Sequence, residues 1–214
     1  SDLRHFVNGY WLDKEGAIKL DPKPLAEWIN KHCENWVENE VEQKELAKLG
    51  IASKICPSCL GDMHKFEISY HPSDTPKIYS SVSGDNFELY GWDKIPKLAE
   101  ENPDIEFHLY GNKGMFMVQD NPINVIVHGR VPKEQMNKEI KNMQGALRLI
   151  PMEGFSEIIA KSILMGQWPI SLIHYPFTLP IEELGQLKNQ KYPNIEGRNH
   201  YLKTLNNFPW NLKK

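Results

Sequence analysis

A regular alternation of short apolar and amphipathic segments between residues 77 and 175 constrains the fold more than any other feature. Apolar runs typical of strands occur at 77–84, 105–112, 123–129, 145–151 and 168–175. Segments with helical spacing lie between most of them, at 91–102, 132–143 and 155–166. Alternation of this kind predicts βα units, and therefore an α/β domain with a doubly wound, mostly parallel, Rossmann-like sheet. The continuous apolar run at 123–129 predicts a strand covered on both faces.

The loops that follow these strands are the places to look for a site. In doubly wound sheets, ligands bind outside the carboxyl ends of the strands. The sequence therefore directs attention to the loops at 83–91, 111–114, 129–133 and 151–156.

The rest of the chain is less regular. Before residue 76 we expect a helix opening at Asp21 and Pro22, a short strand within 32–39, a helix capped by Asn39 and ending at Gly50, and a short strand within 51–57. Helices near 180–189 and 196–208 are expected to close the chain. We predict a lead-in segment over residues 1–36 and a Rossmann-like domain over residues 37–214.

Composition excludes several classes of protein. The chain has 214 residues and is 40% hydrophobic, which suits one large domain or one domain with an appendage. Its formal net charge of −3 argues against a dedicated nucleic-acid binder. No apolar run approaches the length of a membrane span, and the polar start does not resemble a signal peptide. Three cysteines favour a reducing compartment, so we expect a cytoplasmic protein, with peripheral attachment to a membrane left open.

The loop at 151–156 carries the most specific chemistry. Glu153, Gly154 and Phe155 directly precede an apolar helix, with Ser156 and Glu157 in its first turn. A carboxylate and free backbone N–H groups at the positive end of a helix suit an anionic, hydroxyl-rich ligand. The simpler alternative is a surface loop in which Ser156 and Glu157 only cap the helix.

The cysteines give a weaker signal. Cys56-Pro-Ser-Cys59 has Cys33, His32 and His64 as further conceivable zinc ligands, but a single CxxC motif is a poor match to a zinc site. A redox motif would begin a helix after a strand, whereas this segment has the composition of a loop. We therefore predict no metal site, and we expect the histidines to be structural or exposed.

Four segments, in this order, resemble the carboxyl-terminal half of retaining GT-B glycosyltransferases with an E-G-F…E signature (glycosyl transferases group 1). They are VENEVEQKELAKLGIASKICP (37–57), GWDKIPKLAEENPDIEFHLYGN (91–112), NVIVHGRVPKEQM (124–136) and EGFSEIIAKSILMGQWPIS (153–171). The family has two Rossmann-like domains, and the second binds the donor. The resemblance therefore implies that this chain is a single GT-B-type domain, the donor-binding half, with a short lead-in.

The resemblance also implies a function. It is the transfer of a sugar from a nucleotide-sugar donor to a saccharide or lipid-linked acceptor, with retention at the anomeric carbon. No metal or other cofactor is implied, because helix N-termini and basic side chains hold the leaving diphosphate. In this reading Glu153 is the catalytic residue that positions the donor sugar. The donor-binding residues are Gly84, Gly111, Arg130, Gly154, Phe155, Ser156, Glu157 and Lys161. An acceptor-binding domain or subunit would be a partner.

The sequence departs from the family at two points. Lys161 stands where the family has its second glutamate, and Glu157 lies only one helical turn after Glu153. The family's G-R-x4-K-G phosphate motif corresponds to Gly84-Asp85-x4-Tyr90-Gly91, so both cations are absent. Lys161, Arg130 or Arg148 could supply part of the missing charge.

These departures keep a second hypothesis open. It is a catalytically degenerate Rossmann-like module that binds a nucleotide or a partner subunit. A different doubly wound fold is a third hypothesis, but the sequence contains neither a G-x-S-x-G nucleophile motif nor a G-x4-G-K-[ST] phosphate loop.

Overall fold

The computed structural model describes residues 23–205, except positions 59, 83, 85, 112–120 and 152. The chain divides into two compact units, Ser1–Ser58 and Cys59–Lys214. The domain boundary predicted after residue 36 falls inside the first unit, because the strand at Trp36–Val37 pairs with a strand at Lys54–Ile55.

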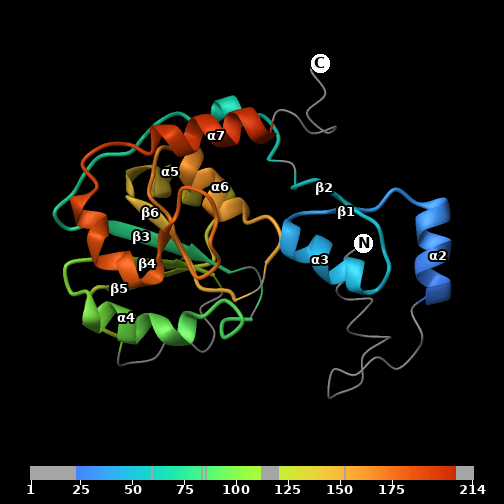
Figure 1. Cartoon of the computed structure of the whole chain (residues 1–214). Helices are drawn as coiled ribbons and strands as arrows, with labels where there is room; N and C mark the ends of the chain where they lie inside the picture. The colour runs from blue at the N-terminus through green and yellow to red at the C-terminus, as the bar shows by residue number, and fades with distance from the viewer. Residues whose placement is uncertain are drawn as a thin grey trace. The chain divides into compact units, whose positions relative to one another are not determined.

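In the described part of the smaller unit, residues 23–58, helices alternate with two very short strands (Figure 1). The elements are α2 (Lys23–His32), β1 (Trp36–Val37), α3 (Glu40–Lys48) and β2 (Lys54–Ile55), and β1 pairs with β2 in parallel. As predicted, Asn39 caps α3: its side-chain oxygen accepts a hydrogen bond from the Glu42 N–H at 2.9 Å. A small core holds the unit together, formed by Ala26, Ile29, Val37, Leu46 and Ile51.

The larger unit is built on a six-stranded sheet. Its strands are β3 (Lys77–Ser81), β4 (Glu106–Tyr110), β5 (Val125–Gly129), β6 (Gly145–Arg148), β7 (Ile170–Ser171) and β8 (Leu179–Pro180). Every pairing is parallel, and the spatial order is β5-β4-β3-β6-β7-β8. This is the Rossmann order, in which the chain winds outwards in one direction and then crosses back to wind in the other.

Helices cover both faces of this sheet (Figure 1). One face packs on α4 (Ile95–Glu101) and on the 3₁₀ segment η5 (Ile181–Asn189). The opposite face packs on α5 (Lys133–Glu139), α6 (Glu157–Leu164) and α7 (Ile195–Leu205). Alternate residues of a strand serve opposite faces, so Ile78 belongs to the first core and Tyr79 to the second. The predicted doubly wound, mostly parallel fold is confirmed.

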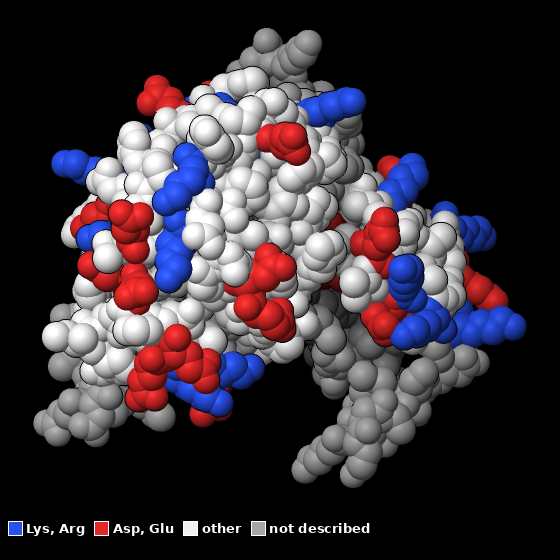
Figure 2. All heavy atoms as spheres, turned by 60° about the vertical axis from the view of Figure 1, so that its left-hand side comes forward, with Lys and Arg blue, Asp and Glu red and all other residues white. Residues whose placement is uncertain are grey.

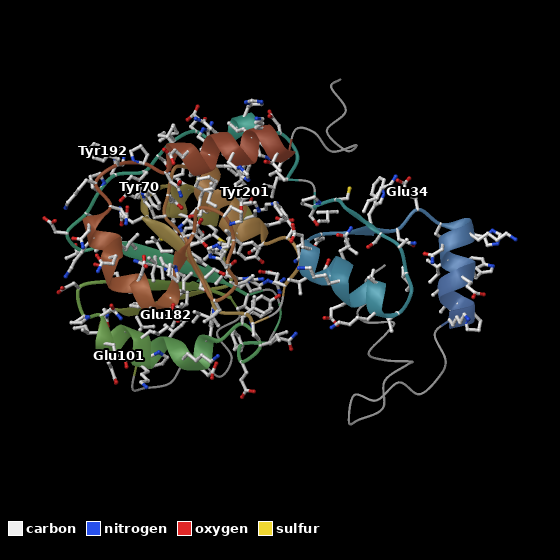
Figure 3. All side chains as sticks on the ribbon, in the orientation of Figure 1. Glu34, Tyr70, Glu101, Glu182, Tyr192 and Tyr201 are labelled. Atoms are coloured by element: carbon white, nitrogen blue, oxygen red, sulfur yellow. The ribbon has the colours of Figure 1, made fainter. Side chains whose placement is uncertain are left out.

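Helix α6 lies deep in the larger unit. Six of its residues are buried, namely Ile158, Ile159, Ala160, Ser162, Ile163 and Leu164. Helix α7 covers it from outside, where Tyr201 joins the same core and is 8% exposed (Figure 3). Tyr192, before α7, is 80% exposed. The burial of α6 explains its nearly continuous apolar sequence.

Among the residues that the structure describes, short 3₁₀ segments account for the remaining regular structure. They are η2 (Met63–Lys65), η3 (Trp92–Lys94), which leads directly into α4, and η4 (Ile140–Asn142), which extends α5. Gly91 precedes η3 with φ of +70°, and a Cβ there would lie 2.5 Å from the Leu149 Cβ. This turn therefore requires glycine for both its backbone conformation and its packing.

Three details of the sequence predictions are wrong. The strand over 123–129 is not covered on both faces, because β5 forms an edge of the sheet and Ile126 is 37% exposed. The strand predicted at 168–175 shrinks to Ile170–Ser171, directly after Pro169, which cannot donate a backbone hydrogen bond. Helix α6 begins at Glu157 rather than at Phe155, with Ser156 at the N-cap.

Charged side chains of both signs lie on the face that Figure 2 displays, with uncharged surface between the groups. Figure 2 shows acidic and basic side chains next to one another on the face it displays. Among the residues that the structure describes, no helix combines the length and apolar character needed to cross a membrane.

Candidate functional site

The sheet topology indicates where a ligand can bind. The strand order reverses between β3 and β6, since β4 lies on one side of β3 and β6 on the other. Chains that leave these two strands diverge, and a crevice opens at their carboxyl ends. Strand β3 ends at Ser81 and β6 ends at Arg148, so both residues lie at the edge of this crevice.

A pocket with a volume of about 400 Å³ occupies this position. Ser81, Arg148 and the fully buried Tyr79 contribute from the strands. One side of the pocket is formed by α5 and the residue after it, with Lys133, Met136, Asn137 and Ile140. Another side is formed around the start of α6, by Glu153, Phe155, Glu157, Ile158 and Lys161. Tyr90, from the loop after β3, completes the lining.

The dominant polar contact in the pocket is an ion pair between Arg148 and Glu153. Arg148 Nε donates to Glu153 Oε2 at 2.8 Å, and Arg148 Nη2 donates to Glu153 Oε1. The two side chains are 10% and 15% exposed. Burial alone would lower the pKa of Arg148, but the hydrogen bonds and charge of Glu153, together with Tyr90, raise it above its usual value. The guanidinium is therefore a fixed positive charge.

A second ion pair lies one helical turn further along. Lys161 Nζ contacts Glu157 Oε2 at 2.9 Å within α6. Lys133, at the start of α5, has no ion-pair partner among the residues that the structure describes. The pocket thus contains three cations and two carboxylates, and both carboxylates are already paired with cations.

The pocket brings together four of the predicted site residues: Glu153, Phe155, Glu157 and Lys161. The other five, Gly84, Gly111, Arg130, Gly154 and Ser156, are not part of its lining. Whether any of the nine contacts a ligand stays a prediction.

Packing accounts for several residues outside the lining. A Cβ on Gly111 would lie 3.0 Å from the Trp92 ring, and the Gly154 carbonyl accepts a hydrogen bond from the Tyr175 hydroxyl. Gly84 has φ of +85° and open space around it. Ser156 stands at the N-cap of α6, but its buried Oγ has no hydrogen-bond partner among the described residues, and its side chain makes no capping hydrogen bond.

Sequence reasoning missed the contribution of α5. Lys133, Met136, Asn137 and Ile140 recur at spacings of three and four residues, which is the pattern of one helical face. The sequence directs attention to the loop at 129–133, but Arg130, the residue selected there, is exposed outside the lining. The helical spacing after Pro132 is the signal that could have identified this wall.

A cluster of titratable groups lies on β4 and β5, on the face of the sheet that also carries the pocket residue Tyr79. His108 Nδ1 and His128 Nε2 are 2.8 Å apart, and His108 Nε2 lies 3.2 Å from Glu106 Oε2, which also contacts Lys77 at 3.0 Å. The His128 ring stacks on Tyr110, with ring centroids 4.4 Å apart. The Tyr110 hydroxyl donates a hydrogen bond to Glu139 Oε2, and this oxygen lies 3.8 Å from His128 Nδ1.

This cluster predicts a pH dependence of stability. Burial lowers the pKa of both His108 and His128 below the ordinary value of 6.5, against the opposing effect of the nearby glutamates. The unfolded chain therefore binds more protons than the folded chain just below pH 6.5, and the free energy of unfolding falls as the pH falls from about 7 to about 5. Chemical denaturation across this range measures the slope.

Non-titrating variants test the assignment. The double substitution His108→Gln and His128→Gln is expected to flatten the dependence on pH. The matched control is His64→Gln at an exposed position, which should leave the slope unchanged. Equal slopes in the wild type and the double variant would show that these histidines do not cause the effect.

The structure gives no further support to a metal or redox centre. Cys56 carries a free thiol whose pKa is raised by burial, which disfavours the reactive thiolate. Cys59 lies outside the described residues. Within the described ranges, no three His, Cys, Asp or Glu side chains gather in an arrangement that could hold a metal ion.

Comparison with known proteins gives structural matches only. No protein-family model matches the chain, and no curated protein matches its sequence. Among solved structures, the chain is similar to a mutant of TarM from S. aureus in complex with fondaparinux, alpha-GlcNAc-glycerol and UDP. The sequence identity is 15% and the TM-score is 0.60, and the match covers 91% of this chain and 44% of TarM. It is also similar to the lipopolysaccharide outer core galactosyltransferase WaaB, with 15% identity, a TM-score of 0.62, and coverage of 83% of this chain and 62% of WaaB.

A third similar structure is Anabaena HepE in complex with UDP-glucose. Its identity is 11%, its TM-score is 0.55, and the match covers 86% of this chain and 66% of HepE. Together, these matches show the fold: an α/β Rossmann-like domain of the type found in GT-B glycosyltransferases. The chain spans about 45% of the length of TarM.

Proposed function

We propose that the larger unit binds the donor of a glycosyltransferase, and that the full activity is transfer of a sugar from a nucleotide-sugar donor to a saccharide or lipid-linked acceptor. The observation that carries this proposal is the pocket at the switch point between β3 and β6, which combines three cations with the start of α6. A nucleotide sugar offers a diphosphate to the cations and hydroxyl groups to the carboxylates. TarM and HepE, whose structures contain UDP or UDP-glucose, support this choice of ligand.

The proposed roles follow from the chemistry of each residue. Glu153 accepts hydrogen bonds from donor-sugar hydroxyls, since a carboxylate can accept more hydrogen bonds than the two that it receives from Arg148. Backbone N–H groups at 154–156 stabilise the charge that develops on the leaving diphosphate. Side-chain cations, rather than a metal cofactor, balance that charge. Transfer of a hexosyl group with retention is the proposed stereochemical course.

The remaining expectations belong to the same proposal. An acceptor-binding domain or subunit complements this unit, in keeping with a chain that spans under half of TarM. A cytoplasmic location, with or without peripheral attachment to a membrane, suits both a saccharide and a lipid-linked acceptor.

Titration calorimetry of the full chain tests the donor site. UDP, GDP, ADP, CDP and their glucose conjugates are the probes, and at least one nucleoside diphosphate is expected to bind. Lys161→Gln is expected to weaken that binding by about tenfold, because it removes a charge-assisted contact. The matched control is Lys97→Gln, at an exposed ion pair on α4, which should have no effect. If no probe binds at millimolar concentration, the proposal is wrong.

One observation favours the alternative of a module without catalysis. Glu153 is held by Arg148 in a nearly buried pair, so it is not a free carboxylate. Hydrolysis or transfer assays with the bound nucleotide sugar distinguish the two functions. Release of free sugar or of a glycosylated acceptor supports an enzyme. Binding without turnover, in the presence of any acceptor-binding subunit, supports the module.

A further inference from the structure

Arg148 occupies an unusual position for a charged side chain. It ends β6, is only 8% exposed, and still forms part of the pocket wall. Taking a charge out of water is costly unless it is paired and hydrogen-bonded, and well-packed apolar residues of similar volume are often at least as stable as a buried ion pair. The burial of this cation therefore calls for a role beyond stability.

Three separate segments converge on this one guanidinium. Glu153, from the loop before α6, accepts two hydrogen bonds from Nε and Nη2. The Ser81 carbonyl, at the end of β3, lies 3.4 Å from Nη1. The Tyr90 ring, from the loop after β3, lies with its centroid 4.3 Å from Arg148 Cζ, within the range of a cation–π contact.

Tyr90 links this arrangement to the departures in the sequence. In the phosphate motif of the family that the sequence resembles, a cation would stand at position 90, and here an aromatic ring does. That ring packs against a cation from a different strand. The positive charge missing from the loop is thus present in the same pocket, contributed by β6.

The existing contacts leave Arg148 able to bind a further anion. A guanidinium has five N–H donors, and Glu153, Ser81 and Tyr90 do not occupy all of them. Its pKa is raised, so the charge is permanent at any physiological pH. Arginine also suits phosphate oxygens better than lysine does, because its donors form a planar fork.

We propose that Arg148 is the residue that contacts the diphosphate of the donor, and that Tyr90 and Glu153 are positioning residues that hold its guanidinium at the carboxyl end of β6. This inference rests on the proposed donor site and assigns its main phosphate contact. Glu153 then has two roles, because the carboxylate that orients Arg148 also faces the sugar hydroxyls. Arg148 thereby connects recognition of the phosphate to the orientation of the sugar-binding carboxylate.

The test compares two variants that differ only at position 148. Glu153→Gln removes the compensating carboxylate and keeps the Arg148 charge. The double substitution Arg148→Gln and Glu153→Gln preserves most of the volume of both side chains without leaving a buried unpaired charge. For each full-length variant, calorimetry measures two affinities: one for the nucleoside diphosphate that binds the wild type, and one for the same nucleoside without phosphate. The quantity compared between variants is the ratio of the first affinity to the second. Circular dichroism checks that both variants fold.

The expected results are specific to phosphate. Glu153→Gln keeps an amide oxygen that can accept a hydrogen bond from the guanidinium and removes the competing negative charge, so it should retain or increase the diphosphate-to-nucleoside ratio. The double variant should lower the ratio by roughly 10- to 100-fold relative to Glu153→Gln. Tyr90→Leu should lower the ratio by roughly threefold or more, and Tyr90→Phe, which keeps the ring, should not. A purely structural role for Arg148 would change both affinities together and leave the ratio unaltered.

Two different failures can be distinguished. If the wild type binds nucleoside diphosphate, and the double variant has the same ratio as Glu153→Gln, then Arg148 is not the phosphate contact and the inference is wrong, while the proposed function stands. If the wild type binds none of the nucleoside diphosphates, the proposed donor site fails and this inference fails with it.

Discussion

The Gly145→Val substitution is expected to lower the free energy of unfolding of the larger unit by about 3–5 kcal/mol, more than the roughly 1–3 kcal/mol that overpacking of a core usually costs. Gly145 opens β6 and pairs with Ile78 in β3. A Cβ at this position would lie 2.1 Å from the Trp168 carbonyl oxygen and 2.9 Å from its carbon. Both are backbone atoms, and the Trp168 N–H is itself bonded to the Gln144 carbonyl, so the clash cannot be relieved by rotating a side chain.

Gly185→Ala is the matched control. Gly185 is exposed within η5, and an added Cβ there would lie 3.5 Å from the Asn102 side-chain oxygen, which is an ordinary contact. Removing backbone freedom from the unfolded chain should leave stability unchanged or raise it by about 0.4–1 kcal/mol. Urea denaturation followed by circular dichroism measures both variants. A Gly145→Val variant as stable as wild type would contradict the close approach of β6 to the segment at Trp168.

The Trp92→Ala substitution is expected to cost about 3–5 kcal/mol. Trp92 is fully buried in the core between the sheet and α4, and its ring lies 5.1 Å from that of Phe87. Its indole Nε1 donates to the buried Ser80 Oγ at 3.0 Å. Truncation would leave a large cavity and an unsatisfied hydroxyl beside the strand that leads to the pocket.

Two comparisons separate these contributions. Trp92→Phe keeps most of the apolar contact and loses the hydrogen bond, so it should cost about 1–3 kcal/mol. Trp28→Ala, at a position that is 56% exposed in the smaller unit, should change stability by no more than about 0.5 kcal/mol. Denaturation of the full chain measures all three. Equal losses for Trp92→Ala and Trp28→Ala would contradict the assigned core.

The fold could be predicted because its signals are local. Apolar runs such as 105–112 and amphipathic segments such as 91–102 show their own period, and their alternation implies parallel strands with helices on both faces. Strand order does not follow from local pattern. The run at 123–129 has the composition of a central strand. In the sheet, however, β5 is the last strand in the order and pairs with β4, so it forms an edge. Strand length depends on pairing too, which is why 168–175 contains just two strand residues.

The candidate site could be predicted only in part, for a similar reason. Glu153, Phe155, Glu157 and Lys161 lie close together in sequence, and the loop that contains the first of them follows a strand end. From the sequence, Arg148 is only one of three possible sources of charge. Its pairing with Glu153 and its stacking on Tyr90 join a strand to two separate loops. Such contacts between separate elements leave no periodic trace in one sequence.

The pocket combines two properties that bear on its function. Two of its three cations, Arg148 and Lys161, are each held by an acidic partner. Its position at the switch point is the one that doubly wound sheets use for ligands. A diphosphate would therefore meet cations that are already oriented, and this reduces the ordering cost of binding.

The most direct test of the proposed donor site is a crystal structure of the full chain with a bound nucleotide sugar, using the nucleotide selected by calorimetry. We predict that the diphosphate lies against Arg148 at the carboxyl end of β6, with Lys133 or Lys161 as a second cation and the sugar facing Glu153. A nucleotide bound elsewhere on the chain, with this pocket empty at saturating ligand, would contradict the account.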